Sequence, residues 1–238
     1  MAAALLAAAS AGAAQPTAIE PFSTSAPGTR LPAGWEEESI ARVPPAEVTL
    51  VDDGGATVLQ VRGRAAAGAA IHALRAPVTD RPFLAWRWKI DRVVNGADLA
   101  RRDADDFAAR LYVFFDIPVE RLPFATRWKI RLARLLYGEN LPTAAICYVW
   151  DNRHPPETSA WSPYTDRVRI VVVESGAARA GQWVDVRRDL DADFHAAFGA
   201  QWTGPAPDVT GVAAGNDTDQ TGESATVRFG DLRLEARR

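Results

Sequence analysis

Apolar and polar residues alternate along much of the chain, in short runs that turn residues separate. A period of two is typical of β-strands with one buried face. Glycine and asparagine turns such as "DDGG" and "VNGAD" lie between the runs, as tight reversals require. The pattern predicts an all-β sandwich or barrel. The clearest runs cover residues 47–53, 56–63, 69–78, 82–91, 106–116, 143–152, 168–175, 182–190 and 225–236.

The run "DFAARLYVFFD" (residues 106–116) has one apolar and one mixed face if it is extended. The predicted core face consists of Phe107, Ala109, Leu111, Val113 and Phe115. On the opposite face, Asp106, Arg110 and Tyr112 place an acid, a base and a phenol in a row. We interpret this row either as a structural ion pair or as the floor of a binding site.

Two stretches break the β pattern. Residues 121–138 have leucine and tryptophan at helical spacing and four basic residues on the opposite side, which predicts a basic amphipathic helix. Such a helix packs on its own domain or lies on a membrane surface. The stretch "DLDADFHAAFG" predicts a short helix in which Phe194 and Phe198 pack at i, i+4 and Gly199 ends the helix.

The length and charge narrow the function classes. With 238 residues, 27 basic and 30 acidic, the chain has a net charge of −3, which argues against nucleic acid as a partner. The start "MAAALLAAASAGAAQPT" is typical of the apolar part of a secretory signal that is cleaved near residue 14. The basic residues that begin such a signal are missing, and a disordered alanine-rich tail is the alternative. We therefore expect a signal peptide over residues 1–14, one β-sandwich domain over residues 15–238, and a periplasmic or secreted protein without a transmembrane segment.

Several separated motifs carry a family resemblance: "LAWRWKI", "DDFAARLYVFFD", "CYVWDN", "VRIVVVESG", "FHAAFG" and "NDTDQTGESATVRFGDLRL". With these motifs in this order, the chain resembles the bacterial family called domain of unknown function 3047, from about Phe22 onward. The resemblance implies a jelly-roll β-sandwich, similar to galactose-binding-like domains and to non-catalytic carbohydrate-binding modules. It also implies an exported protein, and it does not itself imply an activity.

Alternation in neighbouring strands extends the polar face of residues 106–116. If these strands share one sheet, a common surface contains Arg87, Asp106, Arg110, Tyr112, Tyr148, Trp150, Asp185 and Arg187. Aromatic rings beside guanidinium groups and carboxylates suit a sugar or similar polyol, whose C–H faces stack on rings and whose hydroxyls bridge acid and base. Arginine adds affinity for uronic acids or phosphorylated glycans. The alternative is a set of structural ion pairs.

The same acids leave an enzymatic alternative open. Asp105, Asp106, Asp116, Glu174 and Asp185 include enough carboxylates for a glycosidase pair, although no further catalytic signature accompanies them. A second alternative is an envelope scaffold or protein-interaction domain. Non-catalytic carbohydrate binding is the function that the sequence favours.

One loop suggests a metal. In "GNDTDQTG", Asp217, Asp219 and Thr221 stand at i, i+2 and i+4, like the opening of a calcium loop with oxygen ligands. The loop lacks the later glutamate of a full calcium loop, and a turn whose side chains bond backbone donors explains the same residues. Calcium is the only cofactor that the sequence suggests.

Overall fold

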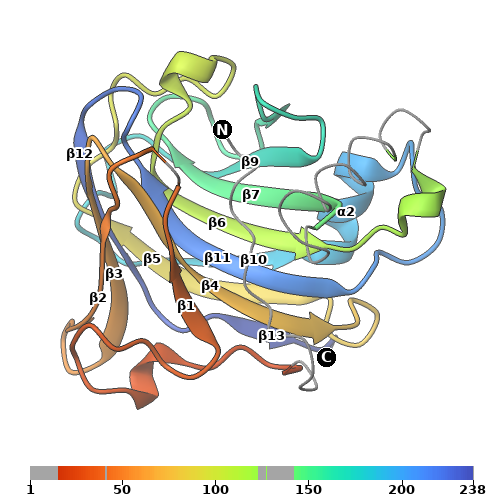
Figure 1. Cartoon of the computed structure of the whole chain (residues 1–238), viewed down its shortest axis with the longest axis horizontal. Coiled ribbons are helices and arrows are strands. Elements are labelled where there is room, and N and C mark those ends of the chain that lie inside the picture. Colours follow the sequence, from red (N-terminus) through yellow and green to blue (C-terminus); the bar gives the residue numbers. More distant parts are fainter. Residues whose placement is uncertain (1–15, 41, 123–126, 128–141, 238) are drawn as a thin grey trace.

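The computed structural model describes residues 16–40, 42–122, 127 and 142–237. Two β-sheets lie face to face (Figure 1). Sheet B has seven strands in the order β1-β4-β11-β6-β7-β9-β8, and every neighbouring pair is antiparallel except β7 and β9. Its strands are β1 (Trp35–Glu38), β4 (Ala67–Ala76), β6 (Phe107–Phe115), β7 (Ala144–Asp151), β8 (Ser159–Trp161), β9 (Val168–Ser175) and β11 (Val209–Asp217).

Sheet A has the order β10-β5-β12-β3-β2, and a short strand, β13, also pairs with β5. Its strands are β2 (Glu47–Asp52), β3 (Thr57–Arg64), β5 (Phe83–Ile90), β10 (Val184–Asp189), β12 (Ser224–Phe229) and β13 (Arg233–Glu235). The 3-10 helices are η1 (Phe22–Thr24), η2 (Arg102–Ala104) and η3 (Val119–Arg121), and α2 spans Leu190–Phe198. The predicted all-β jelly-roll sandwich is confirmed.

All nine predicted runs contain strands, and the last contains two, β12 and β13, with Gly230 between them. The short helix is also confirmed as α2. The side chain of Asp189 caps it by accepting hydrogen bonds from the backbone N–H groups of Asp191 and Ala192, and Phe194 and Phe198 pack with ring centroids 5.1 Å apart.

The main core lies between the two sheets and consists of the inward-facing rows of their strands. Trp86 and Trp88 of β5 face this core and lie next to Tyr148 and Trp150 of β7, with ring centroids 5.4 and 6.0 Å apart. Burial of a large apolar side chain contributes about 1.5–3 kcal/mol, so this aromatic group holds the sheets together.

The predicted face of β6 is correct for Leu111, Val113 and Phe115, which face the core between the sheets. It is wrong for Phe107, which belongs to a second apolar cluster on the other face of sheet B. The pairing of β6 with β11 shifts between Gly215 and Asp217. Such a bulge reverses which face a side chain occupies.

Two expectations fall outside the described residues. The predicted signal peptide lies in residues 1–15, and almost all of the basic helix predicted for residues 121–138 lies in the undescribed part of the chain. In the described residues, no helix is long and apolar enough to cross a membrane.

Candidate functional site

The eight residues predicted to share a surface do not share one, because their strands belong to two different sheets. Five of them lie on or just before strands of sheet B and are at most 6% exposed: Asp106, Arg110, Tyr112, Tyr148 and Trp150. The other three, Arg87, Asp185 and Arg187, lie on β5 and β10 of sheet A. The prediction of one surface is therefore wrong, because alternation is local and strand order is not.

Tyr148 and Trp150 belong to the core between the sheets. The Tyr148 hydroxyl donates a hydrogen bond to Asp193 Oδ2 (2.7 Å), and the Trp150 indole donates to the carbonyl oxygen of Gly176 (2.9 Å). Both polar atoms are thus bonded within the protein, as buried polar groups require. In this structure the two side chains connect β7 to α2 and to the turn after β9.

Arg110 is the centre of a buried ionic cluster on the face of sheet B that points away from the core. Its Nη2 lies 3.4 Å from Asp105 Oδ1 and 3.6 Å from Asp217 Oδ2, and it also donates to the carbonyl oxygen of Asp105. Its Nη1 donates to the Tyr112 hydroxyl (3.0 Å), and its guanidinium stacks on Phe107 at 4.8 Å. We call Asp105, Arg110, Tyr112 and Asp217 the Arg110 cluster.

Arg110 pairs with Asp105 and Asp217, and not with Asp106 as predicted. Asp106 instead accepts hydrogen bonds from the backbone N–H groups of Gln220 (3.3 Å) and Thr221 (2.7 Å). This completely buried carboxylate therefore fixes the loop that precedes β12.

The predicted metal ligands come together only in part. Carboxylate oxygens of Asp217, Asp219 and Asp106 all lie within 4.8 Å of one another. The Thr221 side chain is used otherwise, because its Oγ1 accepts a hydrogen bond from the backbone N–H of Glu223 (3.3 Å). Asp106 thus takes the third place, which we had predicted for Thr221, and calcium binding stays a prediction.

Burial controls the ionisation of the Arg110 cluster. Desolvation raises the pKa of Asp217 well above its usual value, against the attraction of Arg110, and the neighbouring Asp219 raises it further. Desolvation also raises the pKa of Asp105, although Arg110 opposes it. The pKa of Arg110 is raised despite burial, because Asp105 and Asp217 favour its charged form. The guanidinium therefore stays charged, and the excess carboxylates are the groups that take up protons.

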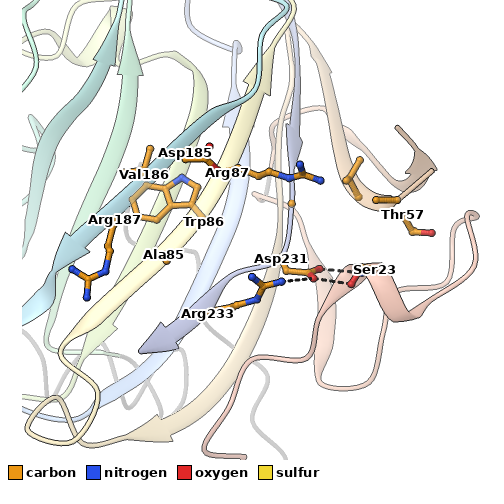
Figure 2. A pocket seen from close by; sticks show the side chains of 13 residues that line it. Ser23, Thr57, Ala85, Trp86, Arg87, Asp185, Val186, Arg187, Asp231 and Arg233 are labelled. Carbon is orange, nitrogen blue, oxygen red and sulfur yellow. Dashed lines mark hydrogen bonds and ion pairs between the residues drawn. The ribbon is translucent and has the colours of Figure 1, made fainter. Parts of the chain in front are cut away.

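The three predicted residues on sheet A line one open pocket of about 530 Å³. Figure 2 shows it between the adjacent strands β5 and β10 and the segment that contains Asp231. We call it the β5–β10 pocket. Its charged lining residues are Arg87, Asp185, Arg187, Asp231 and Arg233.

Arg87 is positioned by an aromatic ring and a glycine. Its guanidinium carbon lies 4.6 Å from the centre of the Trp183 ring, a distance at which a cation and an aromatic face attract. Its side chain also runs close over Gly230, where an added Cβ would lie 2.7 Å from Arg87 Cγ and 2.8 Å from Nε. The absence of a side chain at Gly230 thus gives Arg87 its path across the sheet.

Arg87 and Asp185 are register partners on β5 and β10, and their side chains leave the sheet on the same face. Among the described residues, neither side chain has a hydrogen-bond or ion-pair partner. The pocket's other charges are bonded. Arg187 Nε donates to Glu235 Oε2 (2.9 Å), and Asp231 accepts hydrogen bonds from Ser23 and lies 3.4 Å from Arg233.

The site predicted from the sequence did not include Trp183, Gly230 and Asp231. Alternation along residues 182–190 places Trp183 on the face of Asp185 and Arg187, so a signal for Trp183 was present. The sequence has no comparable signal for Gly230 and Asp231. Gly230 lies next to Arg87, and Asp231 next to Ser23, only once the chain has folded.

A family model for the protein of unknown function DUF3047 matches residues 33–233. The chain belongs to this family. Membership confirms the resemblance in the sequence, and the match covers both sheets from just before β1 into β13. No curated protein matches the chain significantly.

Several solved structures are similar to this family member at low sequence identity. The native family 12 xyloglucanase from Bacillus licheniformis is 8% identical, with 92% of this chain and 100% of that chain covered and a TM-score of 0.48. The xyloglucanase domain of NopAA from Sinorhizobium fredii, in complex with cellobiose, is 10% identical, with coverages of 92% and 100% and a TM-score of 0.46. The family 30 carbohydrate-binding module of a Clostridium thermocellum cellulosomal cellulase is 15% identical, with coverages of 89% and 94% and a TM-score of 0.36.

Proposed function

We propose that this protein binds a carbohydrate non-catalytically in the β5–β10 pocket. The observation that carries the proposal is the pair formed by Arg87 and Asp185, two neighbouring charged groups in one pocket without polar protein partners among the described residues. A sugar offers hydroxyls that donate to a carboxylate and oxygens that accept from a guanidinium, so one ligand satisfies both groups.

The size and openness of the pocket suit such a ligand. A volume of about 530 Å³ lies within the usual range of small-molecule sites. The Arg87 guanidinium is held against Trp183, and a planar, pre-positioned donor loses less freedom on binding than a mobile one. The N-terminal sequence supports the further proposal that binding occurs outside the cytoplasm.

The bonding of the acids favours binding over hydrolysis. Glycoside hydrolysis needs two carboxyl groups at the scissile bond. Of the two acids that line the pocket, Asp185 has no hydrogen-bond or ion-pair partner in the described part of the chain, whereas Asp231 accepts hydrogen bonds from Ser23 and pairs with Arg233. Of the other acids considered for catalysis, Asp105 and Asp106 are buried on the other side of the sandwich.

A glycan array tests the proposal. The protein from residue 15 onward is applied together with Arg87→Ala, Asp185→Ala and the control Arg75→Ala. Arg75 is an exposed arginine on sheet B that pairs with Asp208 (2.9 Å). We expect selective glycan binding that the two pocket variants lose and the control keeps.

Three results would contradict the proposal. A blank array with a folded protein would favour an interaction domain for another protein. Product release from a bound polysaccharide, abolished in Asp185→Asn, would favour a glycosidase. Binding that survives both pocket substitutions would place the site elsewhere.

A further inference from the structure

The β5–β10 pocket has a neighbour on each side along β5. The outward-facing residues of β5 are Phe83, Ala85, Arg87 and Lys89, which alternate with buried ones. Phe83 lines a pocket of about 650 Å³, Ala85 and Arg87 line the β5–β10 pocket, and Lys89 lines a pocket of about 290 Å³. We call the outer two the Phe83 pocket and the Lys89 pocket. Six residues of strand span about 20 Å.

Side chains on the sheet connect these three pockets. Arg187 lines both the Phe83 pocket and the β5–β10 pocket, and its guanidinium carbon lies 3.5 Å from the centre of the Phe83 ring. At the other end, the Trp183 ring contacts both Arg87 (4.6 Å) and Lys89 (4.9 Å). A ligand that follows β5 therefore meets Arg187 first, then Arg87, which has no ion-pair partner among the described residues, and then Lys89.

The outer pockets contain arginines whose ion pairs are loose. In the Phe83 pocket, Arg237 lies 3.9 Å from Asp189, and its side chain is 65% exposed. In the Lys89 pocket, Arg62 lies 3.7 Å from Glu47, and both side chains are 58% exposed. Exposed pairs of this kind contribute little, so an anionic ligand can replace the protein carboxylate.

Two other cations of the Lys89 pocket are held more firmly. Lys89 and Arg228 both pair with Asp53. Burial alone would raise the pKa of Asp53, but the hydrogen bonds and charges of Lys89 and Arg228 outweigh it and lower this pKa. Asp53 thus holds both cations in place, although its one negative charge offsets only one of their two positive charges. Among the described residues of this pocket, Arg62 is the cation most exposed to a ligand.

We propose that the three pockets form one linear groove for an acidic glycan, a chain of uronic acid residues that lies along β5. This inference rests on the proposed function and specifies its ligand. Arg87, which lacks an acidic partner among the described residues, binds a carboxylate at the centre, while Asp185 accepts hydroxyl groups of the same chain. Arg237 and Arg62 contact the ends of longer chains.

The test is calorimetric titration with oligogalacturonates from the monomer to the hexamer, and with neutral cello-oligosaccharides of equal length. We expect affinity to rise with the length of the acidic chain and to exceed that for the neutral chain. Arg237→Ala and Arg62→Ala should each weaken hexamer binding about two- to fivefold, the range of an exposed ion pair, and leave dimer binding unchanged. Arg87→Ala should weaken binding at every length, and Arg75→Ala at none.

Separate outcomes contradict the two proposals. Equal affinity for dimer and hexamer, or hexamer binding that neither end variant changes, would overturn the linear groove while pocket binding stands. Equal binding of polyglutamate would overturn the glycan class. Binding of neutral chains alone would overturn the acidic ligand and leave carbohydrate binding intact, whereas no binding of any glycan would overturn the proposed function itself.

Discussion

Arg110 and Arg87 show how similar strand positions acquire different roles. Each arginine points away from the core between the sheets and stacks on an aromatic ring, Phe107 for Arg110 and Trp183 for Arg87. Arg110 is only 5% exposed and has two carboxylates and a phenol around it. Arg87 faces an open pocket and lacks an acidic partner among the described residues.

The two arginines differ in how deeply they are buried and in whether a carboxylate of the protein pairs with them. Charged groups that are buried and ion-paired within the protein are hardly accessible to a ligand, and disturbing them costs stability. Charged groups that are exposed and unbonded contribute little to stability, and they can bind another molecule. The Arg110 cluster therefore belongs to the folded structure, whereas the β5–β10 pocket is the site that we propose for binding.

The largest expected effect is on the Arg110 cluster. Arg110→Ala leaves Asp105 and Asp217 buried without their counter-charge, so we expect a loss of about 3–5 kcal/mol in the free energy of unfolding. Urea denaturation measures this loss, with Arg75→Ala as the exposed control. A loss below about 1 kcal/mol, the range of an ordinary surface change, would show that the cluster is not structural.

The next effect concerns ligand affinity. Arg87→Ala removes charge-assisted hydrogen bonds to the ligand, which are each worth about 1.5–3 kcal/mol, so we expect glycan affinity to fall about ten- to a hundredfold. The free energy of unfolding should change by less than about 0.5 kcal/mol. Calorimetry and urea denaturation of the same sample measure both. A large stability loss with unchanged affinity would reverse the assignment of the two arginines.

A smaller effect depends on pH. The folded protein holds a proton on Asp217 more tightly than the unfolded chain, because burial raises its pKa. This group's contribution to stability is therefore present at acid pH and is lost as pH rises from about 4, the ordinary Asp value, through its raised value in the folded state. Asp217→Asn should remove this loss and raise the melting temperature at neutral pH by a few degrees.

Melting curves from about pH 4 to pH 7 measure the Asp217 effect. The advantage of Asp217→Asn should shrink toward the acid end. Asp166→Asn serves as the control, because the side chain of Asp166 is 72% exposed. If Asp217→Asn instead lowers the melting temperature at neutral pH, the ionised carboxylate is needed there, and the account of its ionisation is wrong.

The smallest effect tests the path of Arg87 over the sheet. Gly230→Ala introduces a Cβ that would lie 2.7 Å from Arg87 Cγ, so the side chain must shift. We expect glycan affinity to fall about two- to fivefold, since the charge remains and only its position changes. Ser224→Ala, an exposed change on the neighbouring β12, should leave affinity unchanged. Unchanged affinity in Gly230→Ala would show that the position of Arg87 does not matter.

Much of the fold was predictable from the sequence because alternation is strong in most strands. The clearest omission is β11, "VTGVAAGND", which lies between β4 and β6 in the centre of sheet B. Its alanines and glycines are poor strand formers by propensity. The structure explains them, since a Cβ at Gly215 would collide with the carbonyl oxygen of Gly68 on β4. The close approach of β4 and β11 requires small residues here, and the sequence alone does not reveal such an approach.

The candidate site was predictable only where it depends on local pattern. Arg87, Asp185 and Arg187 were grouped correctly, because alternation and the pairing of β5 with β10 place them together. They were wrongly joined to Arg110 and Tyr112, because alternation does not say which sheet a strand enters. The predicted partner of Arg110, Asp106, was also wrong. The bulge in the pairing of β6 with β11 changes which face the residues before Arg110 occupy, and alternation assumes that no bulge is present.

Heteronuclear NMR titration of the labelled protein with an oligogalacturonate tests the central claim most directly. The Trp183 indole N–H and the Arg87 side-chain N–H report on the β5–β10 pocket, whereas the backbone N–H groups of Gln220 and Thr221, bonded to Asp106, report on the loop beside the Arg110 cluster. We predict that the first pair of signals shifts with saturation while the second pair stays in place. Shifts at Gln220 and Thr221 with none at Trp183 and Arg87 would contradict the account.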